Sequence, residues 1–195
     1  GVEVASTGIQ IHGGMGFIEE TGAAQHLRDA RITTIYEGTT GIQANDLIGR
    51  KVLRDGGRSM QALLSQIDAV CEQLEAGDDA QLHAIGARLR EGSKSLADSV
   101  RWILATGMQD LNAVLAGAVP FLHLCGVVCG GWQMARAALA AQRKLAAGDS
   151  DAAFYRAKVA TARFFADQDL SRARGLAEAT MHAGASTMAL AEEQF

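Results

Sequence analysis

One short stretch of the sequence combines residue types that could support acid–base chemistry. Glu37 stands among β-branched and aromatic neighbours, followed by a glycine and two hydroxyl residues, in Ile35-Tyr36-Glu37-Gly38-Thr39-Thr40. A carboxyl group in apolar surroundings has a raised pKa, which suits a general base that works near neutral pH. The glycine allows close approach of a ligand, and a helix that begins at Thr39 or Thr40 offers free N–H groups to phosphate. The pattern indicates a catalytic carboxylate, with a surface glutamate at a turn as the alternative.

A second group of candidate residues lies upstream, in Gln10-Ile11-His12-Gly13-Gly14-Met15-Gly16. A helix over residues 2–12 is expected to end at Gly13 and Gly14, because glycine enters the positive-φ region at little cost. From these residues alone, a plain helix stop is the simpler interpretation.

Three linked motifs between residues 10 and 39 resemble the C-terminal part of the flavin-dependent acyl-CoA dehydrogenase family. They are Gln-x-x-Gly-Gly-x-Gly at residues 10–16, Leu-Arg-Asp-Ala-Arg-Ile at 27–32 and Ile-Tyr-Glu-Gly-Thr at 35–39. Their order and spacing both agree with the family. Residues 40–52 look most like the larger members, which carry an extra helical C-terminal domain. The dehydrogenases of 3-methylmercaptopropionyl-CoA belong to that group.

The resemblance implies a role for each residue of the first stretch. Glu37 would be the base that removes the α-proton of an acyl-CoA substrate while a hydride passes to FAD. Its backbone N–H would donate to the thioester carbonyl, as in an oxyanion hole. Tyr36 and Gly38 would line the acyl pocket. Thr39 and Gly41 would face the FAD phosphates, with Gly41 offering only its backbone where the family often has a polar side chain.

The same resemblance implies partners for the chain. Gln10, Gly13 and Gly14 would lie against the FAD of a neighbouring subunit, so a homodimer or larger homo-oligomer is expected. The product would be a trans-2-enoyl-CoA, with an electron-transfer flavoprotein as electron acceptor. Two alternatives stay open: an acyl-CoA oxidase relative that passes electrons to oxygen, and a helical module for oligomerisation or membrane docking. Because the chain opens without methionine in what reads as mid-helix, we expect an inactive C-terminal piece of a longer enzyme.

The amino-acid composition gives no support for a nucleic-acid-binding protein and favours an all-helical one. The 195 residues carry a formal net charge of −4, with acidic and basic residues interspersed and no basic stripe, so nothing favours nucleic acid. Three cysteines without framework spacing indicate a reducing compartment, and we expect a cytoplasmic location. A single proline and 5% aromatic residues favour helices over sheet.

The apolar spacing predicts an all-α fold in two domains. Residues 1–56 would form the end of the acyl-CoA dehydrogenase helical domain, with a short helix capped by Thr21 and a helix over 40–54. Residues 57–195 would form an additional antiparallel four-helix bundle. Its helices are expected over about 58–76, 80–107, 110–147 with a bend at Pro120, and 151–183.

Two features of the third bundle helix need an interpretation. Residues 111–135 contain no charged side chain and are long enough to cross a bilayer. Polar residues within the segment and amphipathic neighbours favour a buried bundle helix over a transmembrane span. Cys125 and Cys129 lie one turn apart near His123, but no further ligand stands at standard spacing. We therefore interpret them as core residues and predict no metal site.

Overall fold

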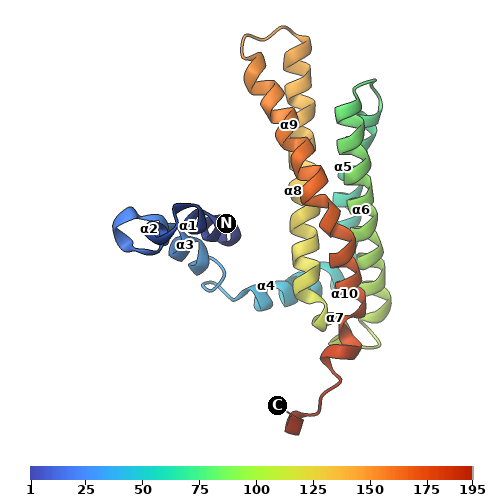
Figure 1. Cartoon of the computed structure of the whole chain (residues 1–195). Helices are drawn as coiled ribbons and strands as arrows, with labels where there is room; N and C mark the ends of the chain where they lie inside the picture. Colours follow the sequence, from blue (N-terminus) through green and yellow to red (C-terminus); the bar gives the residue numbers. More distant parts are fainter. Residues whose placement is uncertain (195) are drawn as a thin grey trace. The chain divides into compact units, whose positions relative to one another are not determined.

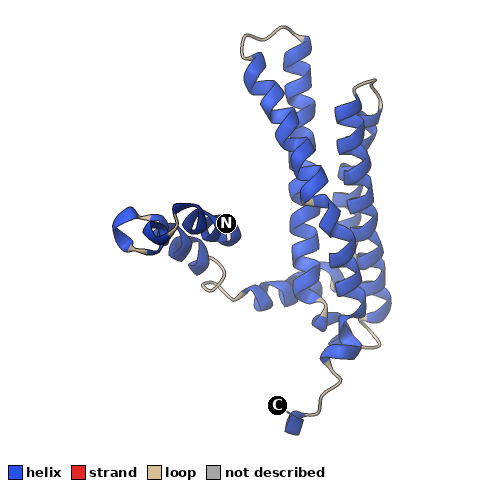
Figure 2. Ribbon diagram, in the orientation of Figure 1, coloured by secondary structure: helices blue, strands red, loops and turns tan. Residues whose placement is uncertain are grey.

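A computed structural model describes residues 1–194, and the regular structure of that range is entirely helical (Figures 1 and 2). The predicted all-α fold class is confirmed. The chain divides by its internal contacts into two compact units, Gly1–Gln43 and the residues from Ala44 onward. The predicted domain boundary after residue 56 stays a prediction, and each unit is described by itself.

The N-terminal unit consists of short helices. They are α1 (Val2–His12), α2 (Gly14–Phe17), η1 (Glu19–Thr21) and α3 (Ala23–Ile32). Gly13 ends α1 with φ 60°, as the sequence predicted. Thr21 does not cap the next helix: Gly22, with φ 76°, precedes α3, and the Thr21 hydroxyl donates instead to the carbonyl of Met15 at 2.7 Å. The left-handed glycine turns the chain before the threonine can reach the helix.

This N-terminal unit has almost no interior. Among residues 1–43 only Gly16 is buried, where a Cβ would stand 2.3 Å from the carbonyl oxygen of Ile9. Large apolar side chains are exposed instead, among them Phe17 at 81% and Ile11 at 80%. The same holds for Val4, Met15, Ile18, Ile32, Ile35, Tyr36 and Ile42. Residues 1–43 therefore do not form a side-chain core by themselves.

A helical connector follows. The predicted single helix over 40–54 is in fact α4 (Thr40–Asp46) continued by a π-helical segment, η2 (Leu47–Leu53). The N–H of Arg54 donates to the carbonyl of Gly49, five residues back, at 3.2 Å. Ile48 and Val52, four residues apart in this segment, are fully buried against the bundle.

The C-terminal unit is a helical bundle in which α5 and α8 run one way and α6 and α9–α10 run the other (Figure 1). Its fully buried side chains include Phe121, Ile67, Leu74, Leu89, Leu96 and Val128. The elements are α5 (Arg58–Glu75), α6 (Ala80–Thr106), α7 (Leu111–Ala116), α8 (Ala118–Ala146), α9 (Ala152–Gln168), η3 (Leu170–Arg172), α10 (Ala173–Thr187) and η4 (Glu192–Gln194).

Aspartates begin two of the bundle helices. Asp79 caps α6, since its Oδ1 accepts from the N–H of Gln81 at 2.8 Å and of Leu82 at 3.2 Å. Asp110 caps α7 in the same way by accepting from the N–H of Ala113 at 2.9 Å. Asp55, two residues before the N-cap Gly57 of α5, accepts from the N–H of Ser59 at 3.0 Å. Hydrogen bonds from Ser59 hold the pKa of Asp55 below its usual value.

Two of the predicted bundle helices are interrupted. The third breaks at Gly117 into α7 and α8, while Pro120 lies in the first turn of α8, where proline is tolerated. Close packing at the break requires glycine, because a Cβ on Gly117 would lie 2.2 Å from the carbonyl oxygen of Thr180. The fourth is split into α9 and α10 by η3, whose buried Leu170 covers Gly131.

Helix α8 alone, among the helices of residues 1–194, has the length and hydropathy of a membrane span. It packs against α5, α6, α9 and α10, so its apolar face is used within the bundle. Phe121, Leu124 and Val128 on that face are fully buried. Burial in the bundle accounts for this face, although only 33% of the most apolar window of α8 is buried. The absence of a transmembrane span stays a prediction.

Candidate active-site loop

Glu37 lies at the tip of a small closed loop between α3 and α4. The N–H of Tyr36 donates to the carbonyl of Ile32 at 3.2 Å, which extends the end of α3. The N–H of Thr40 donates to the carbonyl of Thr34 at 3.3 Å, which closes the loop over residues 35–39. The side chain of Arg31 holds the base of this loop by donating to the hydroxyl of Thr34.

The backbone of Glu37 is strained. Its φ is 56°, and no other non-glycine residue of 1–194 has a positive φ. The left-handed region costs an ordinary residue about 1–2 kcal/mol, because Cβ crowds the carbonyl oxygen. Strain of this kind clusters at active sites and ligand clamps. The residue with the predicted catalytic role is thus also the most unusual backbone position in the described chain.

Three neighbours support this conformation. Gly38 continues the turn with φ 95°, a value that favours glycine. The side-chain amide of Gln43 donates to the carbonyl of Glu37 at 2.7 Å. The hydroxyl oxygen of Thr39 accepts from the N–H of Ile42 at 3.4 Å, so the predicted helix start at Thr39 and Thr40 is confirmed.

The surroundings of Glu37 differ from the expectation. Its side chain is exposed, and its carboxylate forms no ion pair or hydrogen bond within residues 1–194. Tyr36 is 54% exposed. The apolar enclosure expected around the carboxylate is therefore not supplied by this part of the chain. Across the same residues, the N–H groups of Glu37 and Thr39 donate to no acceptor.

The remaining predicted site residues fall into two groups. Gly41 is half-buried in the first turn of α4, beside the Glu37 loop. Gln10, Gly13 and Gly14 are exposed at the turn between α1 and α2, where the N–H of Gly13 donates to the carbonyl of Gln10 at 3.1 Å. A Cβ on either glycine would meet no atom within 4 Å. No hydrogen bond within residues 1–194 joins this turn to the Glu37 loop.

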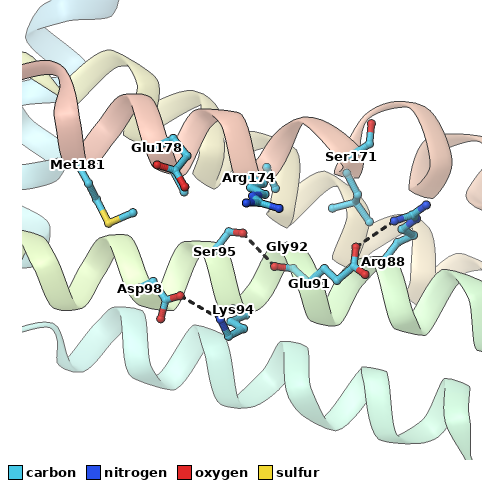
Figure 3. Close-up of a pocket in the computed structure, with 13 residues that line it drawn as sticks. Arg88, Glu91, Gly92, Lys94, Ser95, Asp98, Ser171, Arg174, Glu178 and Met181 are labelled. Atoms are coloured by element: carbon cyan, nitrogen blue, oxygen red, sulfur yellow. Dashed lines mark hydrogen bonds and ion pairs between the residues drawn. The ribbon is translucent and has the colours of Figure 1, made fainter.

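The bundle has a groove of about 690 Å³ between α6 and α10 (Figure 3). Its charges are already paired along α6: Arg88 with Glu91 at 3.0 Å, and Lys94 with Asp98 at 3.5 Å. Arg174 and Glu178 on the opposite wall balance each other in sign. None of the predicted site residues lines this groove, and its balanced charge favours no particular ligand.

The cysteines of α8 are half-buried, and Cys125 packs against the core of the bundle. Burial raises the pKa of the Cys125 thiol to about 12, and burial also raises the pKa of Cys129. Within residues 1–194, no three His, Cys, Asp or Glu side chains lie close enough together to hold a metal ion. Thiols with raised pKa are poor nucleophiles and poor metal ligands at neutral pH.

Family models account for both parts of the chain. The model described as "Acyl-CoA dehydrogenase, C-terminal domain" matches residues 1–53. The model described as "Acetyl-CoA dehydrogenase C-terminal like" matches residues 63–191, which is more than half of the chain. The chain belongs to the acyl-CoA dehydrogenase family.

Several dehydrogenases are similar to this family member over most of its length. A 3-methylmercaptopropionyl-CoA dehydrogenase of Ruegeria pomeroyi is 56% identical over 87% of this chain and 28% of its own. A broad-specificity linear acyl-CoA dehydrogenase, FadE5, of Mycobacterium tuberculosis is 33% identical over 81% of this chain and 27% of its own. A butyryl-CoA dehydrogenase of Syntrophomonas wolfei is 31% identical over 95% of this chain and 30% of its own. The chain thus spans less than a third of each of these relatives.

The described residues fit a flavin nucleotide in part. The unpaired N–H groups of Glu37 and Thr39 and the Thr39 hydroxyl are donors whose hydrogen bonds a phosphate or carbonyl oxygen could accept. The open space before Gly13 and Gly14 would admit another molecule closely. Residues 1–43 enclose no pocket for a flavin ring, so its enclosure would need groups beyond this unit.

Two features of the loop were not predicted from the sequence. One is the left-handed conformation of Glu37 itself. The other is the bond from Gln43, a residue that the sequence presented only as part of the helix after the loop. A glutamine in the first turn after a glycine loop is the signal that could have suggested such a bond.

Proposed function

We propose that the complete protein is an FAD-dependent dehydrogenase that oxidises an acyl-CoA to the trans-2-enoyl-CoA. The main support is Glu37, which lies in the motif where this family carries a base. Its backbone is strained, its side chain is exposed, and its backbone N–H has no acceptor. The names of the similar proteins support a dehydrogenase rather than an oxidase. FAD, when bound, supplies the acceptor for the hydride that leaves the β-carbon.

In this proposal each residue of the loop has a separate role in proton removal or in binding substrate and cofactor. The carboxylate of Glu37 takes the α-proton, while its free N–H donates to the thioester oxygen and stabilises the developing enolate. Tyr36 and Gly38 border the acyl group. Thr39 and the backbone of Gly41 face the cofactor phosphates, near the free N–H groups of the loop.

The other predicted features belong to the same proposal. Gln10, Gly13 and Gly14 contact the FAD of a neighbouring subunit, which requires a homodimer or larger homo-oligomer. Their exposure and the open space before both glycines support this role. We also propose a cytoplasmic location, an electron-transfer flavoprotein as electron acceptor, and no turnover by residues 1–195 alone.

The test of the base is Glu37→Gln in the full-length enzyme. The amide has nearly the same shape but cannot accept the α-proton, so kcat should fall by about 10²–10⁴-fold. The bound flavin per subunit should not change. Glu20→Gln, at an exposed glutamate of the same unit, is the matched control and should keep full activity. Near-normal turnover by Glu37→Gln would remove this residue from the role of base.

A further inference from the structure

Gln43 reaches back from α4 to the loop that carries Glu37. Its backbone N–H donates to the carbonyl of Thr39 at 3.0 Å, which fixes the residue in the first turn of the helix. Its side-chain Nε2 donates to the carbonyl of Glu37 at 2.7 Å. The carbonyl at the strained position is therefore tied to a regular helix by one side chain.

The loop is shaped around this side chain. A Cβ on Gly38 would lie 3.3 Å from Nε2 of Gln43 and 3.2 Å from Cγ2 of Ile42. Glycine at position 38 thus leaves room for the amide as well as permitting φ 95°. The arrangement needs both residues, since the glycine opens the space that the glutamine occupies.

The bond to the carbonyl has a consequence for the carboxylate. A trans peptide is planar, so fixing the Glu37 carbonyl fixes the whole peptide plane between residues 37 and 38. That plane sets ψ of Glu37, while the closed loop fixes the residues before it. The direction of the Glu37 Cα–Cβ bond follows from the orientation of this plane. The N–H of Glu37 belongs to the preceding peptide plane, which lies within the closed loop.

We propose that Gln43 is a positioning residue, which holds Glu37 in its left-handed conformation so that carboxylate and N–H both face the substrate. This inference rests on the proposed function of Glu37 as the base. A base must lie within hydrogen-bond reach of the proton that it removes, and misplacement by about 1 Å can cost on the order of a hundredfold in rate.

The test is Gln43→Met in the full-length enzyme. Methionine has nearly the same length and a good helix propensity but no N–H donor. We expect kcat to fall on the order of ten- to a hundredfold, with KM and bound flavin nearly unchanged. The kinetic isotope effect with α-deuterated substrate should rise, because proton removal becomes slower relative to other steps. A crystal structure of this variant should show Glu37 leaving its positive φ.

Two further variants complete the design. Gln25→Met, at an exposed glutamine of α3 whose side chain forms no hydrogen bond within residues 1–194, should match the parent enzyme. Gln43→Lys restores an N–H donor and should recover most of the rate and the parental isotope effect. If Gln43→Met does not accumulate as a flavoprotein, the test is Gln43→Lys alone. Turnover near the parental rate would then support the positioning role, and strongly reduced turnover would refute it.

Other results would overturn the inference. One is parental kcat and isotope effect in Gln43→Met. Another is a loss of kcat that only matches a loss of bound flavin, since a merely structural role would lower the active fraction without changing the isotope effect. The proposed function fails separately, through an active Glu37→Gln enzyme.

Discussion

At the scale of single residues, the free-energy cost of the left-handed backbone of Glu37 is offset by a few hydrogen bonds. The left-handed backbone costs about 1–2 kcal/mol. A neutral hydrogen bond such as that from Gln43 contributes about 0.5–1.5 kcal/mol, so it can offset much of that cost by itself. The loop-closing bond from Thr40 to Thr34 adds a similar amount. The loss of any one neighbour should therefore shift the loop without unfolding the molecule.

Gly38→Ala tests this balance from the other side of the loop. The alanine Cβ would be strained at φ 95° and would press on Gln43 and Ile42. We expect the full-length enzyme to fold and bind flavin but to lose about tenfold or more in kcat/KM, in keeping with 1–2 kcal/mol of strain. Steady-state kinetics measure this loss. Gly8→Ala in α1, where no atom lies within 4 Å of the new Cβ, is the control and should have parental kinetics.

At the scale of elements, the sequence predicted helices more reliably than their interruptions. The apolar spacing predicted α5 and α6 close to their observed bounds, because this pattern acts over a few neighbouring residues. The close contact at the Gly117 break involves instead Thr180, a residue distant in sequence. The π-helical η2 packs Ile48 and Val52 into the bundle, although these two residues are spaced as on an ordinary α-helix. Such tertiary causes leave no local pattern to read.

The candidate site shows the same division. The motif identified Glu37 and the helix start at Thr39, since residue type and order carry that information. It did not predict the positive φ of Glu37, which Gln43 and the closed loop impose together. The expected enclosure of the carboxylate was not found either, because it would need side chains outside residues 1–194.

Two glycine substitutions in the bundle should change stability in opposite directions. Gly117→Ala would force a Cβ to within 2.2 Å of the Thr180 carbonyl oxygen, so α7 and α10 would have to separate. We expect a loss of about 1–3 kcal/mol in the free energy of unfolding. Gly126→Ala in α8 meets no atom within 4 Å and should instead gain about 0.5–1 kcal/mol. Urea unfolding measures both, and equal effects would contradict this account of the break.

At the scale of the whole molecule, the two units differ in how far each can stabilise itself. All of the buried large apolar side chains lie beyond residue 43, whereas residues 1–43 bury only Gly16. Hydrophobic burial is the main favourable term in folding, at about 25 cal/mol per Å² of apolar area. The bundle therefore has its own source of stability, while the unit that carries Glu37 depends on contacts that residues 1–194 do not provide.

This difference predicts unequal hydrogen exchange along the 195-residue chain. Amides of α1, α3 and the Glu37 loop should exchange orders of magnitude faster than those of α6 and α8, because their helices can open without exposing a core. Mass spectrometry of peptic peptides would resolve the two units. In the full-length enzyme, we expect exchange in residues 1–43 to slow markedly while exchange in the bundle changes little. Equal protection of both units in the 195-residue chain would mean that the N-terminal helices are stable without a core, and the apolar side chains on their surface would then need another explanation.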